Sequence, residues 1–223
     1  MKKFLTLLFA IISLTGFAQH KAVQSGFRGG TGAVWFTGDM KEVKKNGMSI
    51  GGSWGFVVDI FLMEGYWLNT GFNILYLNGK LSAEGDAVLP DSTVVSGNYD
   101  IKLRAKYAEI PVVLSMKTKN INGFFRIYGQ IGFGFAYLLK SDGSQTFGSD
   151  DGSYSFENDL PDGKASLRST RESLLLGAGM EFPVAGSTYI RTGLRFDNAF
   201  IPVFHNDNKG KNQILEVNVA VIF

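Results

Sequence analysis

The sequence predicts an all-β fold, an eight-stranded antiparallel transmembrane up-and-down β-barrel. Apolar residues alternate with small or polar residues along segment after segment, which is the period of a β-strand. The chain contains 28 glycines and 19 phenylalanines but only 5 prolines, and no stretch beyond its first residues sustains the apolar period of a helix. Long and short connections follow one another along the chain between these segments. This asymmetry is typical of outer-membrane barrels.

The first 18 residues have the layout of a secretory signal peptide. Two lysines at positions 2 and 3 precede an apolar stretch from Phe4 to Leu14, and a small-x-small motif ends at Ala18. The apolar stretch is shorter than the ~20 residues that a membrane-spanning helix needs. We therefore expect a signal peptide over 1–18 and a barrel domain over 19–223.

Charge and cysteine content exclude several classes of function. The signal peptide carries 2 of the 22 basic residues and none of the 20 acidic ones, which leaves 20 of each sign in the barrel domain. The pI of about 8.7 therefore gives no indication of a nucleic-acid partner. The absence of cysteine excludes a disulfide framework and thiolate catalysis. We expect no cofactor and no resident metal.

Eight segments carry the strand period, in chain order 27–37, 49–62, 66–77, 101–116, 124–139, 172–182, 189–200 and 212–223. In segment 124–139, Phe125, Ile127 and Phe133 share one face, and the opposite face carries mainly glycine, alanine and a few polar residues. A soluble β-sandwich, the alternative fold, would carry more Lys, Glu and Thr on its second face. Small residues there are typical of a narrow lumen, and the apolar face would then contact lipid.

Segment 101–116 has a mixed face. Lys102, Arg104 and Lys106 have the same parity as Ile110 and Val112. Either a β-bulge in mid-strand switches the face, or the charged half of the strand stands above the bilayer. The second explanation is preferred.

The connections set the expected orientation. The long ones are 38–48, 78–100, 140–171 and 201–211, and the short ones are 63–65, 117–122 and 183–187. Outer-membrane barrels have short periplasmic turns and long external loops. We therefore expect an outer-membrane location in a Gram-negative bacterium, with both termini in the periplasm.

The final segment ends on Phe223, directly after alternating apolar residues. In a closed barrel the last strand pairs with the first, so the sheet has no free edge. A lipid-facing terminal aromatic residue resembles the terminal signature of bacterial outer-membrane proteins that the assembly machinery recognises. We expect Phe223 to be both a girdle residue and an assembly signal.

The inward faces of the predicted strands carry charges of both signs. The expected positions are Arg28, Asp59, Glu109, Arg126, Glu181 and Arg191 in the periplasmic half, and Arg195, Asp197 and Glu216 higher up. Such charges must be paired, because an unpaired buried charge costs several kcal/mol. Eight strands leave an interior just wide enough for side chains. We therefore predict a filled lumen, with a narrow solute channel as the alternative.

Catalytic candidates are few. His205 lies near Asp207 in a predicted loop, where the pair would suit a lipid- or peptide-modifying enzyme at the rim of the barrel. Both residue types are also ordinary turn formers, and no nucleophile can be placed beside them by spacing. The sequence favours a protein that is not an enzyme.

The two longest predicted loops, 78–100 and 140–171, are the favoured site of function. They contain four isolated aromatic residues, Tyr99, Phe147, Tyr154 and Phe156. Aromatic side chains often anchor partners. We therefore expect a protein or glycan ligand at the external loops, in addition to contacts with outer-membrane lipid.

Three motifs suggest a family. "YAEIPVVLSMKT" (107–118), "FFRIYGQIGFGFAYLL" (124–139) and "ESLLLGAGMEF" (172–182) resemble the PorT-like outer-membrane β-barrel proteins of Bacteroidetes. The resemblance implies an outer-membrane barrel. Some members of that family serve protein secretion or gliding systems, so a link to a secretion or envelope system is also implied.

Overall fold

The protein is described by a computed structural model over residues 22–38, 44–45, 47–88, 92–149, 152, 154–159, 167–204 and 209–223. The predicted signal peptide and His205 lie outside these residues. No helix in the described part of the chain is long and apolar enough to cross a membrane.

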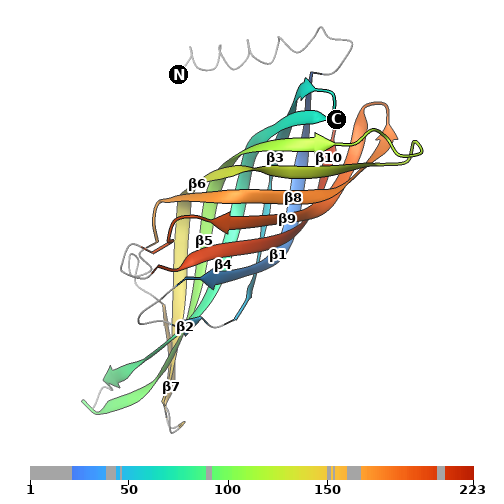
Figure 1. Cartoon of the computed structure of the whole chain (residues 1–223). Helices are drawn as coiled ribbons and strands as arrows, with labels where there is room; N and C mark the ends of the chain where they lie inside the picture. Colours follow the sequence, from blue (N-terminus) through green and yellow to red (C-terminus); the bar gives the residue numbers. More distant parts are fainter. Residues whose placement is uncertain are drawn as a thin grey trace, which may run out of the picture.

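Eight long strands close into one antiparallel barrel (Figure 1). They are β1 (Val23–Thr37), β3 (Ser49–Met63), β4 (Tyr66–Val88), β5 (Val94–Lys117), β6 (Arg126–Ser149), β8 (Thr170–Ala185), β9 (Thr188–Ala199) and β10 (Lys211–Ile222). Each strand pairs with the next along the chain, and β10 pairs with β1 from Gly26 opposite Ile222 to Thr37 opposite Lys211. The predicted eight-stranded antiparallel barrel is confirmed.

The two ends of the barrel differ. One end, the turn end, carries the tight connections at 64–65 and 186–187, the connection at 118–125, and the last residue of β10. At the other, the extended end, β4, β5 and β6 project beyond the barrel wall (Figure 1). Two short strands flank this projection: β2 (Lys44–Lys45) pairs with β4, and β7 (Ser155–Asp159) pairs with β6.

The prediction that 78–100 and the first part of 140–171 are loops is wrong. β4, β5 and β6 contain 23, 24 and 24 residues, whereas β9 and β10 contain 12 each. Polarity had suggested loops, but the strand period continues along 79–88, where glycine, leucine and alanine alternate with lysine, serine, glutamate and aspartate. A strand with water on its outer face produces this pattern.

The structure excludes the first of the two alternatives, a switch of face along β5. Odd-numbered residues from Leu103 to Val113 are buried without interruption, so this strand does not switch faces. The irregularity lies in the partner strand: Lys106 pairs with Lys140 and Tyr107 with Leu138, which leaves Leu139 as an extra residue of β6. The charged half of β5 therefore continues the outer face of its apolar half.

The outer surface of the barrel is apolar. Phe27 is 64% exposed, Phe133 50% and Val217 59%, and all three point away from the lumen. A continuous exposed apolar surface of this kind marks contact with lipid or a partner. The alternative fold, a soluble β-sandwich, is therefore wrong.

Phe223 lies at the seam between the first and last strands. Its backbone exchanges two hydrogen bonds with Ser25, with N–O distances of 2.8 and 3.1 Å. Its half-exposed ring lies 6.4 Å from the ring of Phe27, measured between centroids. The residue thus occupies the outward position expected for a girdle residue at the turn end.

Candidate functional site

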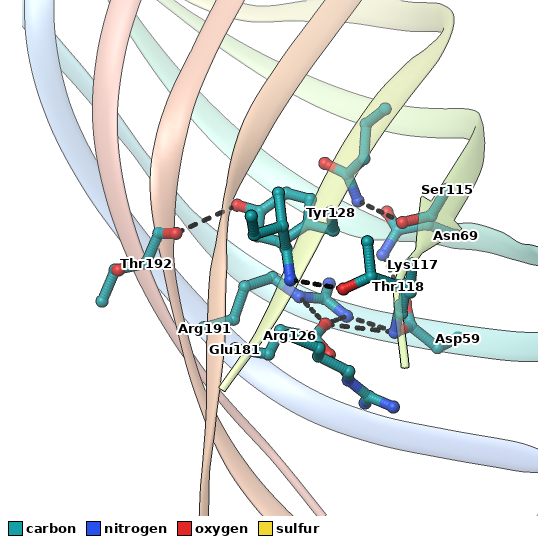
Figure 2. Close-up of polar contacts among 12 residues, drawn as sticks. Asp59, Asn69, Ser115, Lys117, Thr118, Arg126, Tyr128, Glu181, Arg191 and Thr192 are labelled. Atoms are coloured by element: carbon teal, nitrogen blue, oxygen red, sulfur yellow. Dashed lines mark hydrogen bonds and ion pairs between the residues drawn. The ribbon is translucent and has the colours of Figure 1, made fainter. Parts of the chain in front are cut away.

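The lumen near the turn end is occupied by a cluster of charged side chains. This turn-end cluster consists of Asp59 on β3, Lys117 on β5, Arg126 on β6, Glu181 on β8 and Arg191 on β9 (Figure 2). Lys117 Nζ lies 2.6 Å from Asp59 and 3.1 Å from Glu181, and Arg191 Nε donates to Glu181 at 2.6 Å. Arg191 also pairs with Asp59, and Arg126 pairs with Glu181. Each carboxylate is therefore shared by at least two cations.

Tyr128 covers this cluster on its inner side. Its hydroxyl donates to the backbone oxygen of Thr192 at 3.4 Å, and the Arg191 guanidinium lies 5.4 Å from its ring centroid (Figure 2). Glycine makes room for the ring: a Cβ at Gly193 would lie 2.2 Å from the Tyr128 hydroxyl, and one at Gly179 would lie 2.7 Å from it. The glycine-rich inward faces thus accommodate a large lumenal side chain.

Further along the barrel axis, two arginines each bind one carboxylate at hydrogen-bond distance. Arg195 Nη2 lies 2.7 Å from both carboxylate oxygens of Glu109, which also accepts a hydrogen bond from Asn73. Arg171 binds Asp197 through two nitrogens, at 2.6 and 3.2 Å. Bidentate arginine–carboxylate pairs are strong and fix geometry.

The remaining lumenal pair joins the first and last strands. Arg28 pairs with Glu216, and Ser53 Oγ donates to the other oxygen of that carboxylate at 2.6 Å. Among the described residues, two small spaces of about 20 Å³ each persist beside Arg28 and Arg195. Each holds roughly one water molecule. The charged part of the lumen is therefore filled.

Apolar side chains fill the lumen toward the extended end. This apolar cluster contains Val34, Phe36, Leu75, Leu77, Leu81, Leu103, Ala105, Tyr107, Ala136, Leu167, Val203 and Ile214. Leu167 and Val203 come from the connections that flank β8 and β9, and a single β-bridge between Leu167 and Phe204 holds these connections together. The connections that contain Leu167 and Val203 thus fold inward and close this half of the lumen.

The structure places all nine charged residues predicted for the lumen on inward faces, but it changes their grouping. Glu109 was expected in the periplasmic half, yet it pairs with Arg195 and belongs to the higher group. Lys117 and Arg171 are buried members that the sequence analysis missed, because it placed them in connections. Residues two apart in a strand face the same side, so Lys117 follows the inward Ser115, and Arg171 precedes the inward Ser173. Extending each predicted strand by two residues would have identified both.

The four aromatic residues predicted to contact a partner have different environments. Phe147 is fully buried, with its ring 4.9 Å from that of Tyr99, so these two side chains hold the projecting strands together and the role predicted for Phe147 as a contact residue is wrong. Tyr154 is 45% exposed beside the β6–β7 connection. The backbone of Phe156 lies in β7, opposite Phe147, while its side chain falls outside the described part of the structure, as does the whole of His205.

Three exposed ion pairs lie outside the lumen in the described part of the chain, and two of them lower the pKa of their carboxyl group. At the turn end, Lys119 Nζ lies 2.9 Å from Glu64, and this hydrogen bond, together with the charge of Lys119, lowers the pKa of Glu64. On the projecting strands, Lys44 lowers the pKa of Glu84 in the same way. No group of three or more metal-ligating side chains occurs in the described ranges.

The chain is similar to several solved structures. Solved structures similar to the chain include Ail, the attachment invasion locus protein of Yersinia pestis, with 16% identity, a TM-score of 0.32, and coverage of 90% of this chain and 98% of that chain. A second structure of Ail, with 16% identity, a TM-score of 0.35 and coverage of 90% and 99%, is a complex with the heparin analogue sucrose octasulfate. The outer membrane protein OprG from Pseudomonas aeruginosa has 11% identity, a TM-score of 0.38 and coverage of 90% and 94%.

No curated protein sequence matches the chain. Among protein families, the outer membrane protein beta-barrel domain matches residues 17–205, which is most of the chain. The match agrees with the closed antiparallel barrel and its apolar outer face. The chain belongs to the family of outer membrane protein beta-barrel domains.

Proposed function

We propose that this protein is a binding or scaffold component of the outer membrane that recognises a protein or glycan ligand through its extended end. The observation that carries the proposal is the contrast between a lumen filled along its length and a wall that rises on one side into a projecting sheet. A filled barrel gives solutes little space. A projecting sheet held by continuous strand pairing offers a largely preformed surface on which a partner can bind without ordering a long loop.

The projecting sheet is built from β2, β4, β5, β6 and β7 (Figure 1). Backbone pairing between β4 and β5 continues from Tyr66–Met116 to Val88–Val94. The packing of Tyr99 on Phe147 fixes its inner face. We place this sheet outside the cell and the turn end, with both termini, in the periplasm, because outer-membrane barrels have short periplasmic turns.

The resemblance of segments 107–118, 124–139 and 172–182 to PorT-like proteins supports a partner within a secretion or envelope system. We propose that catalysis is not involved and that Phe223 serves as the signal to the assembly machinery. Its outward position beside the β1–β10 seam supports this role.

The proposal is tested by shortening the projecting sheet while keeping the barrel. Residues 85–97 are replaced by Asn-Gly, because Glu84 lies opposite Asn98 and a two-residue turn can join opposite strand positions. Residues 145–158 are replaced in the same way between Ser144 and Asp159. The variant should remain a heat-modifiable barrel in outer membranes and should lose the ability to complement a strain that lacks the gene.

The matched control is His205→Ala, which should complement fully. If the shortened protein complements and the histidine variant does not, the rim enzyme replaces our proposal. Purified wild-type protein in planar bilayers should show no steady conductance, whereas a large, stable conductance would favour the solute channel.

A further inference from the structure

A group of cations lies on the outer face of the three tallest strands. This outer cation patch consists of Lys80 on β4, Lys102, Arg104 and Lys106 on β5, and Lys140 on β6. All are exposed except Lys106, which is half-buried. Lys80 lies directly opposite Lys102, and Lys106 lies directly opposite Lys140. Like charges at opposite positions of a sheet are destabilising, so this arrangement calls for an anion from outside the chain.

The protein itself compensates the charge of the patch only in part. Two exposed acids share this face: Asp142 lies directly opposite Arg104 and 3.0 Å from Lys140, and Asp100 precedes Lys102 by two residues on β5. In the part of the chain that the structure describes, Lys80, Lys102 and Arg104 form no salt bridge. Lys106 Nζ instead lies 5.5 Å from the centroid of the Tyr76 ring. The patch therefore keeps most of its positive charge.

An apolar groove adjoins the patch on the same strands. It has a volume of about 350 Å³. Phe72, Ala108, Ile110, Phe135 and Tyr137 form its apolar lining, and Thr170, Arg171 and Glu172 of β8 also line it. Ala108 forms its floor, since its side chain is much smaller than those of the outward-facing neighbours. Ala108 and Lys106 have the same parity and lie two residues apart on β5, so the groove opens directly below the cations, on the apolar side.

The opposite wall of the barrel lacks this combination. On β1, β10 and β9, the outward residues Trp35, Gln213 and Asn198 lie side by side and carry no charge, and the next outward residue of β10 is the single cation Lys211. Trp35 stacks on Phe196 with a centroid distance of 6.2 Å. The patch and groove are thus a local feature of β4–β6.

We propose that the outer face of β4–β6 binds a phosphorylated lipid of the outer leaflet, with its phosphate groups on the outer cation patch and one acyl chain in the groove at Ala108. The position of the patch at the upper border of the apolar outer surface places it at headgroup level. Basic side chains at this level attract anionic lipid headgroups, and the groove selects for a ligand that also carries an acyl chain. The site is separate from the filled lumen and from the far end of the projecting sheet.

The test uses the purified full-length barrel in phosphatidylcholine nanodiscs with added lipid A, an acylated and phosphorylated disaccharide, and measures bound lipid A per barrel by native mass spectrometry. In the triple variant Lys80→Gln, Lys102→Gln, Lys106→Gln, affinity should fall on the order of a hundredfold, since each basic side chain near anionic lipid contributes about a fivefold factor. The matched control removes the same charge elsewhere, with Lys119→Gln, Lys209→Gln and Lys211→Gln, and should bind normally.

A second variant examines the groove without changing the charge. Ala108→Phe should fill the floor and weaken lipid A binding, while leaving the patch intact. Inorganic phosphate should compete only weakly with lipid A. Equal losses in the two triple variants, effective competition by inorganic phosphate, or normal binding by Ala108→Phe would each overturn the proposal. Because Ala108→Phe and the single variant Lys102→Gln each change one outward side chain, they test the site even where the triple variant fails to fold.

Discussion

The two halves of the barrel interior are filled by different kinds of side chain. Toward the turn end, carboxylates are shared between lysine and arginine residues, as Asp59 and Glu181 are in the turn-end cluster. Toward the extended end, leucine, valine and aromatic side chains form the apolar cluster. Removing one apolar side chain leaves a cavity, whereas removing one charge also leaves its partners unpaired in a dry environment. The charged half should therefore tolerate substitution least.

The largest effect is expected for Glu181→Gln. Glu181 is fully buried and pairs with Lys117, Arg126 and Arg191. Loss of its charge leaves Lys117 and Arg191 to share Asp59 and leaves Arg126 without a carboxylate among the described residues. The free energy of unfolding should fall by about 3–5 kcal/mol. Urea unfolding in lipid vesicles, followed by tryptophan fluorescence, measures this loss. A loss below about 1 kcal/mol would show that the charged half is no more sensitive than an exposed surface.

A somewhat smaller effect is expected for Leu75→Ala in the apolar cluster. Leu75 is 2% exposed, and its truncation should cost about 3 kcal/mol through lost burial and a residual cavity. The control is Leu194→Ala on the outer face of β9, where the side chain is 52% exposed and the cost should be smaller. Equal unfolding midpoints for the two variants would contradict tight packing of the apolar cluster.

Arg126→Ala should have an intermediate effect, although this residue belongs to the charged half. Arg126 lies at the edge of the turn-end cluster, and Glu181 keeps Lys117 and Arg191 when it is removed. The expected loss is about 1–2 kcal/mol, from one charge-assisted hydrogen bond and the stacking of the guanidinium on Tyr189. Arg126→Lys should recover part of the stability. A loss as large as that of Glu181→Gln would show that the cluster depends equally on every member.

The smallest effect is expected for Glu64→Gln at the turn end. Lys119 lowers the pKa of Glu64, so the pair contributes stability above the unfolded-state pKa and loses it as the pH falls through the lower folded-state pKa. Both side chains are highly exposed, however, and solvent screens their interaction. The unfolding midpoints of variant and wild type should coincide at pH 7 and at pH 3. A clear difference at pH 7 that disappears at pH 3 would show that an exposed pair matters here.

The strand count was predictable because the inner and outer faces of a narrow barrel differ in chemistry at every second residue. The same alternation assigned nine charges to the lumen. It also continues to Lys117 and Arg171, but the expectation of polar loops ended the strands too early. In the projecting strands the outer face is exposed to water. Charged side chains on that face are therefore compatible with regular strand pairing, which continues up to Val88.

The apolar cluster and the pairing of charges across the lumen were not predictable in the same way. In Ile74–Leu77 both faces are apolar or aromatic, so no period separates the lumenal leucines from the outward residues. Glu109 on β5 and Arg195 on β9 are not on neighbouring strands. Their contact depends on the tilt and register of the whole barrel, and these are properties of the closed sheet rather than of one segment.

The tall strands also give the molecule uneven resistance to local opening. Within the barrel, each strand is held by hydrogen bonds on both sides and by packed side chains in the lumen. Beyond Ser82, where β2 ends its pairing, β4 is paired with β5 alone. Such a segment can fray and close again without disturbing the rest of the sheet. The tip of the projecting sheet can therefore open locally while the barrel wall stays closed.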